Sequence, residues 1–210
     1  MTAPRPPIRF VIFDLDNVLV QFQPQRRLDY LASLTGLTPQ HLHDAIWGSD
    51  FESAAEAGAY ADPDAYLAEF NRRISLQISV EQWIAGRRAA MQLRPEVLGI
   101  ARELQGRVGL AVLTNNGSLL KRSLPELVPE VCALFGTSAH ASYEFNSRKP
   151  DVAVYQRLLQ RYGVDPASAV HIDDDAEYVK GAIAAGLNAV TFHSARELRE
   201  SLPGLGLAID

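Results

Sequence analysis

The stretch FVIFDLDN, residues 10–17, decides the fold, because it joins a short apolar run directly to two carboxylates. An uninterrupted apolar run of this length is typical of a buried strand in a parallel sheet. Asp14 and Asp16 follow it at once. In an open parallel α/β sheet, ligands bind in the crevice beyond the carboxyl ends of the strands, and acids two residues apart can reach the same small volume. The stretch therefore predicts a ligand site at the end of a buried strand.

Similar apolar runs recur along the chain and alternate with helical patterns. The runs are at residues 108–113, 169–172 and, more weakly, 189–192. The helical patterns that follow or precede them are at residues 95–104, 152–162 and 179–185. This alternation is typical of βαβ units. We expect an α/β fold with a Rossmann-like parallel sheet and helices on both of its faces.

Residues 21–92 lack a confident strand pattern and carry helical patterns instead. Two of these begin at Thr38-Pro39 and Asp62-Pro63, where an N-cap residue is followed by proline in the first helical turn. We predict a core formed by residues 1–20 and 93–210, and a helical insertion at residues 21–92. The insertion leaves the sheet directly after the first acidic pair, so we expect it to cover the crevice, exclude water and select the substrate. The alternative, an insertion that only adds hydrophobic core, stays open.

The composition of the 210-residue chain disfavours nucleic acid and anionic membranes as partners. It holds 20 Lys and Arg against 25 Asp and Glu, a formal net charge of −5, so a broad basic surface is not expected. No apolar run approaches membrane-spanning length, the first seven residues lack the apolar centre of a secretory signal, and the lone Cys132 cannot form an internal disulfide. We expect a cytoplasmic protein, a monomer or homodimer, that acts on a small anionic metabolite.

Polar groups stand where strands are predicted to end or helices to begin. They are Asp14 and Asp16, Thr114-Asn115-Asn116, Lys149-Pro150, and Asp173-Asp174-Asp175. Mg²⁺ prefers oxygen ligands and keeps waters and substrate phosphate in its shell. If the two acidic strand ends are neighbours in the sheet, Asp14, the backbone carbonyl of Asp16, and Asp174 would meet that demand.

The same residues can carry phosphoryl transfer. With a metal beside it, Asp14 could attack phosphorus and form an aspartyl-phosphate, and Asp16 could protonate the leaving alkoxide and then deprotonate water. The Thr114 hydroxyl, the Asn115 backbone N–H and the Lys149 ammonium are donors suited to the phosphoryl oxygens. A cation at a helix start is unfavourable against the helix dipole, which hints at an anionic partner for Lys149.

These motifs, Asp-x-Asp-x-Val, Thr-Asn, Lys-Pro and Asp-Asp in this order, resemble those of the haloacid dehalogenase-like hydrolases. Residues 93–97, 147–151 and 171–186 are similar to the branch that contains sugar-phosphate phosphatases and the phosphatase domain of soluble epoxide hydrolase. The resemblance implies a helical cap at the insertion, and Glu56-Ala57-Gly58 matches a short pattern often found there. It also implies that the strand ending at Ile172 lies beside the strand ending at Phe13.

The resemblance further implies the roles of the site residues. Asp14 would be the nucleophile and Asp16 the acid/base, with Thr114 and Lys149 holding phosphate. Asp174 would bind Mg²⁺ directly, and Asp173 would orient its surroundings.

Several residues depart from the family pattern. Asn17 and Val18 stand where many members have Gly and Thr. Asn146 replaces a common Gly, and Asn is the next residue to tolerate left-handed backbone. Tyr178 replaces an Asn or Asp that often supports the metal loop, and Asp175 replaces a small Ser; both changes lie beside the metal ligands, where neighbouring residues tune metal affinity. Asp175 is better interpreted as a helix N-cap than as a ligand.

The remaining candidates receive structural interpretations. We expect His171 to be a strand residue with a satisfied side chain. Trp47, Phe51 and Tyr60 are expected to form the core of the insertion. The arginine pairs at 72–73 and 87–88 are expected on solvated faces, where one of them could meet a distal charge of the substrate.

The sequence thus predicts a Mg²⁺-dependent phosphatase that hydrolyses a small phosphomonoester, most plausibly a sugar phosphate. Three alternatives stay open: a phosphomutase, a 2-haloacid dehalogenase, and a non-catalytic module that binds a phosphorylated ligand. A dehalogenase would leave the acid/base function of Asp16 unused, because cleavage of a carbon–halogen bond releases no alkoxide that needs a proton.

Overall fold

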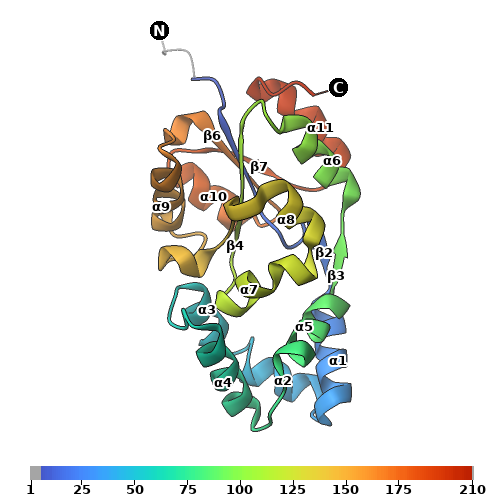
Figure 1. Cartoon of the computed structure of the whole chain (residues 1–210). Coiled ribbons are helices and arrows are strands. Elements are labelled where there is room, and N and C mark those ends of the chain that lie inside the picture. Colours follow the sequence, from blue (N-terminus) through green and yellow to red (C-terminus); the bar gives the residue numbers. More distant parts are fainter. Residues whose placement is uncertain (1–5, 210) are drawn as a thin grey trace.

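The computed structural model describes residues 6–209, whose chain path is drawn in Figure 1. A five-stranded parallel sheet in the order β5-β4-β1-β6-β7 forms its centre. The strands are β1 Phe10–Phe13, β4 Gly109–Thr114, β5 Ala139–Ala141, β6 Ala169–Asp173 and β7 Asn188–Thr191. The α/β fold class and the four predicted apolar strands are confirmed, within one residue at most ends. The short strand β5 was missing from the prediction, because three residues carry too little pattern.

Helices cover both faces of this sheet, as predicted. They are α6 Pro95–Leu104, α7 Ser118–Leu127, α8 Pro129–Phe135, α9 Val152–Tyr162, α10 Ala176–Ala184 and α11 Ala195–Ser201. Short 3₁₀ turns lie at Gly136–Ser138, Ser142–Phe145, Pro166–Ser168 and Leu202–Leu205. In Figure 1, α9 and α10 lie on one side of the strands, and α6, α8 and α11 lie on the other.

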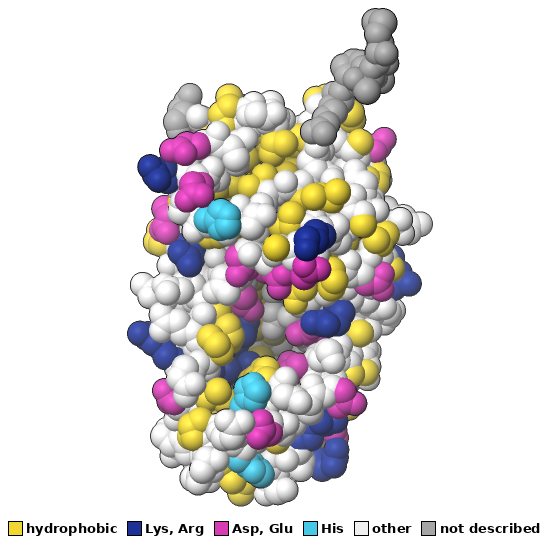
Figure 2. Space-filling model, turned by 180° about the vertical axis from the view of Figure 1, so that it is seen from behind, with side chains coloured by type: hydrophobic (Ala, Val, Ile, Leu, Met, Phe, Trp, Pro, Cys, Tyr) yellow, Lys and Arg dark blue, Asp and Glu magenta, His cyan; other side chains and the backbone are white. Residues whose placement is uncertain are grey.

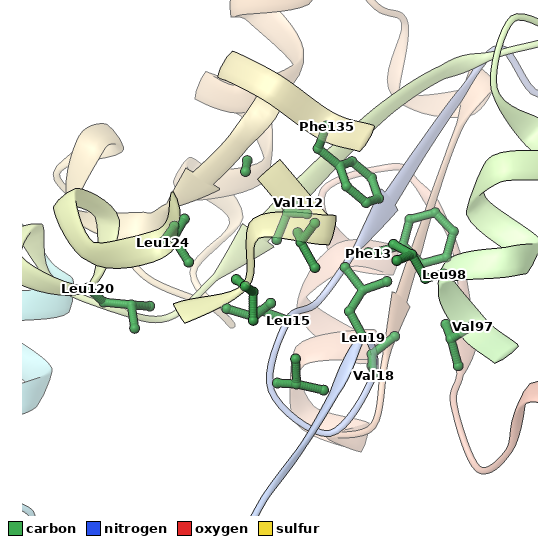
Figure 3. Close-up of a cluster of buried hydrophobic side chains, with 14 of the residues drawn as sticks. Phe13, Leu15, Val18, Leu19, Val97, Leu98, Val112, Leu120, Leu124 and Phe135 are labelled. Atoms are coloured by element: carbon green, nitrogen blue, oxygen red, sulfur yellow. The ribbon is translucent and has the colours of Figure 1, made fainter. Parts of the chain in front are cut away.

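Successive side chains of β1 point alternately into two separate hydrophobic clusters. Val11 and Phe13 belong to the larger cluster, which includes residues of α6, α7, α8 and α11. Phe10 and Ile12 belong to the smaller one, with residues of α9 and α10. Successive strand residues point to opposite faces, so β1 is buried from both sides. Figure 3 shows Phe13, Leu15 and Leu19 in the larger cluster: the residue between the two acids anchors their loop in the core.

The helical insertion, residues 21–92, gathers below the carboxyl ends of the strands (Figure 1). Its helices are α1 Pro24–Thr35, α2 Pro39–Ala45, α3 Phe51–Glu56, α4 Pro63–Ile74 and α5 Val80–Ala89. Both predicted N-caps are confirmed: the Thr38 side chain accepts from the His41 N–H, and that of Asp62 accepts from the Asp64 N–H. The proline after each cap has φ preset for the first turn.

The expectation of no strand in residues 21–92 is wrong at the two ends of that range. Strands β2 Val20–Phe22 and β3 Met91–Leu93 pair antiparallel, with Val20 opposite Leu93 and Phe22 opposite Met91. Each has only three residues and is incompletely buried, so neither shows a period-two pattern. The two passages of the chain between sheet and insertion are therefore joined by a ribbon.

Aromatic residues form the interior of the insertion. The Phe51 ring contacts Tyr60, Tyr66 and Phe70, and the Trp47 ring contacts Phe70. Phe51 is fully buried, whereas Trp47 and Tyr60 are only partly buried against the cluster. The larger hydrophobic cluster continues from the sheet into these helices. Over residues 6–209, none of the helices has the length and hydropathy needed to cross a membrane.

Candidate active site

The sheet order brings the predicted residues to one edge. Phe13 pairs with Val112 of β4 on one side and with Ile172 of β6 on the other. The Asp14 N–H donates to the Ile172 carbonyl at 2.9 Å. The two acidic strand ends are therefore neighbours, as the resemblance implied.

A cavity of about 210 Å³ opens at this edge. It is lined by Asp14, Asp16, Asn17, Glu56, Thr114, Asn115, Lys149, Asp174, Asp175 and Tyr178. Except for Asp173, which lies just beneath, every residue predicted for catalysis, phosphate binding or metal binding lines this one space. Glu56 comes from the insertion, so the cavity lies between the sheet and the helices that cover it.

Three carboxylates converge beside the cavity. Asp14, Asp173 and Asp174 each offer an oxygen, and these oxygens lie within 4.8 Å of one another. Asp14 and Asp173 are buried, whereas Asp174 is exposed. Both oxygens of Asp173 are engaged: Oδ2 bonds Lys149 and His171, and Oδ1 accepts from the Asp175 N–H. Asp174 is thus the freer of the two neighbouring acids.

Lys149 is fully buried and lies between two of these carboxylates. Its Nζ is 2.9 Å from Asp14 Oδ1 and 2.6 Å from Asp173 Oδ2. Burial alone would lower the pKa of Lys149, but Asp14 and Asp173 outweigh it and hold that pKa above its usual value. Burial raises the pKa of Asp14, against the attraction of Lys149 and with the repulsion of Asp173. The lysine is therefore a permanent cation inside the acidic cluster.

The Lys149 loop is fixed to the end of β4 by Asn115. The Asn115 side chain donates to the Lys149 carbonyl at 2.9 Å and accepts from the Lys149 N–H at 2.8 Å. The helix after this loop begins only at Val152, with Asp151 as its N-cap. Sequence reasoning used the Asn115 backbone N–H alone and missed this side-chain role. Asn116 was a candidate without an assigned role, and it donates to Thr114 Oγ1 at 2.8 Å and to Asp16 Oδ2 at 3.3 Å.

The expectation that Arg87 lies on a solvated face is wrong. Its side chain is only 3% exposed, and its Nη2 lies 2.5 Å from Asp16 Oδ2. Its guanidinium also lies over the Phe22 ring, at 4.1 Å. A signal was present in the sequence, because Arg87 follows Trp83 and Ile84 at helical spacing and so shares their buried face of α5. Arg72 and Arg88 are largely exposed, as expected, while Arg73 is partly covered by its bonds to Glu69 and Asp50.

Glu56 carries the insertion's own carboxylate into the cavity. Its Oε2 accepts from Arg148 Nε at 2.6 Å, and its carbonyl accepts from the Ser142 hydroxyl at 2.8 Å. Burial raises the pKa of Glu56 to about 7, because the attraction of Arg148 does not fully compensate for lost hydration. Sequence reasoning had noted the Glu-Ala-Gly pattern without assigning a role to the carboxylate.

The departures from the family pattern are accommodated locally. Asn146 adopts the left-handed conformation, φ 46°, as predicted, and Asp175 caps α10 by accepting from the Glu177 N–H. The Tyr178 ring lies 4.8 Å from Lys149 Nζ, where its face attracts the ammonium. His171 bonds Asp173 through Nε2 at 2.9 Å, but its buried Nδ1 has no partner, so its side chain is only half satisfied.

Comparison with known proteins agrees with this geometry. The family model of the haloacid dehalogenase-like hydrolases matches residues 8–186. The chain belongs to this family. It is therefore an enzyme of the hydrolase class, and the recognition made from the motifs is confirmed.

Individual relatives extend the match over nearly the whole chain. It is 27% identical over 220 residues to "Phosphatase MT3486" of Mycobacterium tuberculosis, with 97% of each protein covered. In fold it is similar to the HAD family enzyme BT-2542 of Bacteroides thetaiotaomicron, solved with magnesium and inorganic phosphate (TM-score 0.74, 17% identity, 89% and 94% of the two chains covered). It is also similar to the L-2-haloacid dehalogenase of Xanthobacter autotrophicus (TM-score 0.58, 17% identity, 96% and 84% covered).

Proposed function

We propose that this hydrolase is a Mg²⁺-dependent phosphatase that cleaves a small phosphomonoester, such as a sugar phosphate, through an aspartyl-phosphate on Asp14. One observation carries the proposal: Asp14, Asp16, Thr114, Lys149 and Asp174 line a single cavity of about 210 Å³. The phosphatase name of the mycobacterial relative supports it, as does the phosphate bound by the Bacteroides fold neighbour. The cytoplasmic location stays a prediction.

The donor set fits magnesium. Carboxylate oxygens of Asp14, Asp173 and Asp174 lie within 4.8 Å of one another, and hard oxygen donors are what Mg²⁺ prefers. We assign direct binding to Asp14, the Asp16 carbonyl and Asp174. Asp173 holds Lys149 and the Asp175 backbone instead. When bound, the cation offsets the repulsion between the nucleophilic carboxylate and the incoming phosphate.

The chain's own residues then divide the chemistry. Asp14 attacks phosphorus and carries the phosphoryl group, while Lys149 and the Thr114 hydroxyl stabilise the negative phosphoryl oxygens. Asp16 protonates the leaving oxygen and afterwards deprotonates the water that releases phosphate. Arg87 and Asn116 hold the Asp16 carboxylate where it can do this.

Asp16 also favours phosphatase over dehalogenase activity. An alkoxide leaving from phosphorus needs a proton, whereas a halide leaving from carbon does not. The fold neighbour that is a dehalogenase is 17% identical, which shows a shared fold and leaves the chemistry to the site. Arg87 holds the Asp16 carboxylate at 2.5 Å, and Asp16 lines the cavity together with Asp14, which is the placement that an acid/base for ester cleavage needs.

Hydrolysis of p-nitrophenyl phosphate with and without Mg²⁺ tests the proposal. Asp14→Asn should abolish turnover, whereas Asp29→Asn, a change on the exposed surface of α1, should leave it intact. Asp16→Asn should slow hydrolysis of an alkyl phosphate much more than that of p-nitrophenyl phosphate, because nitrophenolate leaves without protonation. Full activity in excess chelator, undiminished turnover by Asp14→Asn, or halide release from 2-chloropropionate would refute it.

A further inference from the structure

The helical insertion contains a second cavity, of about 360 Å³. Its lining comes from β2, α1, α2 and the turn after α2: Phe22, Pro24, Gln25, Arg27, Leu28, His43 and Trp47. None of these residues lines the catalytic cavity. The volume lies within the range of small-molecule sites, and a mostly apolar wall with a few polar groups is typical of them.

Arg27 is the unusual member of this wall. It is only 4% exposed, and its guanidinium lies 4.8 Å from the Trp47 ring and 4.7 Å from the Trp83 ring. The two rings cover it, but its Nε and Nη2 have no hydrogen-bond partner. Among residues 6–209, no carboxylate forms an ion pair with it, although Glu52 and Asp16 attract it from farther away. Burying an unpaired charge is costly, so an arginine held in this way points to an anion that is not part of the chain.

The second cavity lies next to the catalytic one. Phe22, which lines it, donates its backbone N–H to Asn17 Oδ1 at 3.1 Å, and Asn17 lines the catalytic cavity. Arg87 lies over the Phe22 ring and bonds Asp16. Arg87 and Phe22 therefore connect Asp16 to the wall of the second cavity.

The position of Asp16 indicates the direction in which the leaving group extends. Asp16 must touch the leaving oxygen, so the organic part of the substrate extends away from phosphorus on the Asp16 side. Figure 2 shows the surface hollowed where the sheet-bearing part meets the insertion, with acidic side chains along the upper border of the hollow and a histidine below it. A leaving group on the Asp16 side therefore faces Arg87 and Phe22, which border the second cavity.

We propose that the second cavity receives a carboxylate at the distal end of the leaving group, with Arg27 as its cationic partner and Phe22 and Trp47 as its apolar wall. This rests on the proposed phosphatase function and narrows its substrate class to phosphomonoesters with an apolar or aromatic body and a terminal carboxylate. A guanidinium pairs with a carboxylate through charged hydrogen bonds. One carboxylate balances the single charge of Arg27, whereas a second phosphate would bring nearly two.

A matched pair of substrates tests the charge. 4-Carboxyphenyl phosphate and the neutral 4-carbamoylphenyl phosphate have similar shape, and only the first can pair with Arg27. Arg27→Gln should lower kcat/KM for the carboxylated ester by at least about tenfold, the loss expected for one charged hydrogen-bonded pair. The ratio of kcat/KM for the carboxylated ester to kcat/KM for the carbamoyl ester should therefore fall. Arg26→Gln, which alters the exposed neighbour on the same helix, should leave both values unchanged.

Benzoate binding measured by calorimetry provides a readout that needs no turnover. Wild type and Arg26→Gln should bind benzoate more tightly than benzamide, and Arg27→Gln should lose this preference. Because replacing a buried arginine can unfold a protein, a second variant, Gln25→Trp, fills the cavity from its exposed edge. It should weaken benzoate binding while circular dichroism stays native.

The outcomes separate the two proposals. If phosphate esters are hydrolysed but benzoate does not bind, or Arg27→Gln binds it as wild type does, the carboxylate site is refuted and the phosphatase proposal stands. If no phosphate ester is hydrolysed, the phosphatase proposal fails, and with it the assignment of the carboxylate to a leaving group, whatever benzoate does. A preference of wild type for the carbamoyl ester over the carboxylated one also refutes the site.

Discussion

Removing the Lys149 ammonium should destabilise the protein and make its stability depend on magnesium. Lys149→Met leaves Asp14 and Asp173 buried together without the cation that lies 2.9 Å from one and 2.6 Å from the other. Removing one partner from a buried ion pair costs about 3–5 kcal/mol. The total stability of a domain is about 5–15 kcal/mol, so we expect a folded but weakened variant.

Two conditions should restore part of this loss. Lys149 lowers the pKa of both carboxylates in wild type, so its removal raises both, and the folded variant holds more protons than folded wild type. Its stability relative to wild type must then fall as the pH rises from 5 to 8, and the deficit is smallest at pH 5. Magnesium at one hundred times its dissociation constant would add about 2.7 kcal/mol, and it should stabilise the variant more than wild type, since no ammonium competes for the carboxylates.

Urea unfolding followed by circular dichroism at pH 5, 6.5 and 8, with Mg²⁺ or with chelator, measures these differences. Lys180→Met is the matched control, because Lys180 is exposed and pairs only with Glu177 on the same helix. It should unfold like wild type in every condition. The reasoning is refuted if Lys149→Met is as stable as wild type at pH 8 in chelator, or if magnesium stabilises both equally.

Three further predictions concern the insertion. Arg87→Gln should lower kcat for an alkyl phosphate by about 10–100-fold, the cost of misplacing a catalytic group, with KM little changed and partial recovery in Arg87→Lys. The loss should be smaller with p-nitrophenyl phosphate, and an unaltered kcat for the alkyl phosphate would show that Arg87 does not position Asp16. The pKa of Glu56 is about 7 in the folded protein, against its usual 4.5. The free energy of unfolding should therefore fall by about 3 kcal/mol as the pH rises from 4.5 to 7. Glu56→Gln should lack this loss in urea unfolding, and equal pH profiles would contradict it. Gly58 has φ 99°, and a Cβ added there would lie 2.6 Å from Asn146 Oδ1. Gly58→Ala should therefore lower the melting temperature, through about 1–3 kcal/mol of strain. A melting temperature equal to that of wild type would contradict this.

The acidic strand ends could be predicted because their signal is local. An apolar run followed at once by carboxylates fixes both the strand and the edge at which Asp14 and Asp173 emerge. The sheet order β4-β1-β6 then brings the residues of all four motifs to one cavity. No single motif contained that order, which came from the resemblance, and the register of β1 against β6 confirms it.

Buried cations were the part that the sequence did not reveal. Arg27 and Arg87 belong to a residue type that is mostly exposed, and each is buried by contacts with residues far away in the chain. The acid that pairs with Arg87 stands 71 residues earlier. Helical spacing shows that Arg87 shares a face with Trp83, but it does not show what that face meets. The three-residue strands β2, β3 and β5 were too short to carry a pattern.

The pairing of β2 with β3 determines how the helices can move against the sheet. The polypeptide passes twice between the two parts, and these passages are hydrogen-bonded side by side. Two independent tethers would allow sliding and twisting, whereas a paired ribbon bends as one strip about a single axis. An opening of the catalytic space would then be a swing about that axis, and the contact of Arg87, one turn before β3, with Asp16 lies next to it.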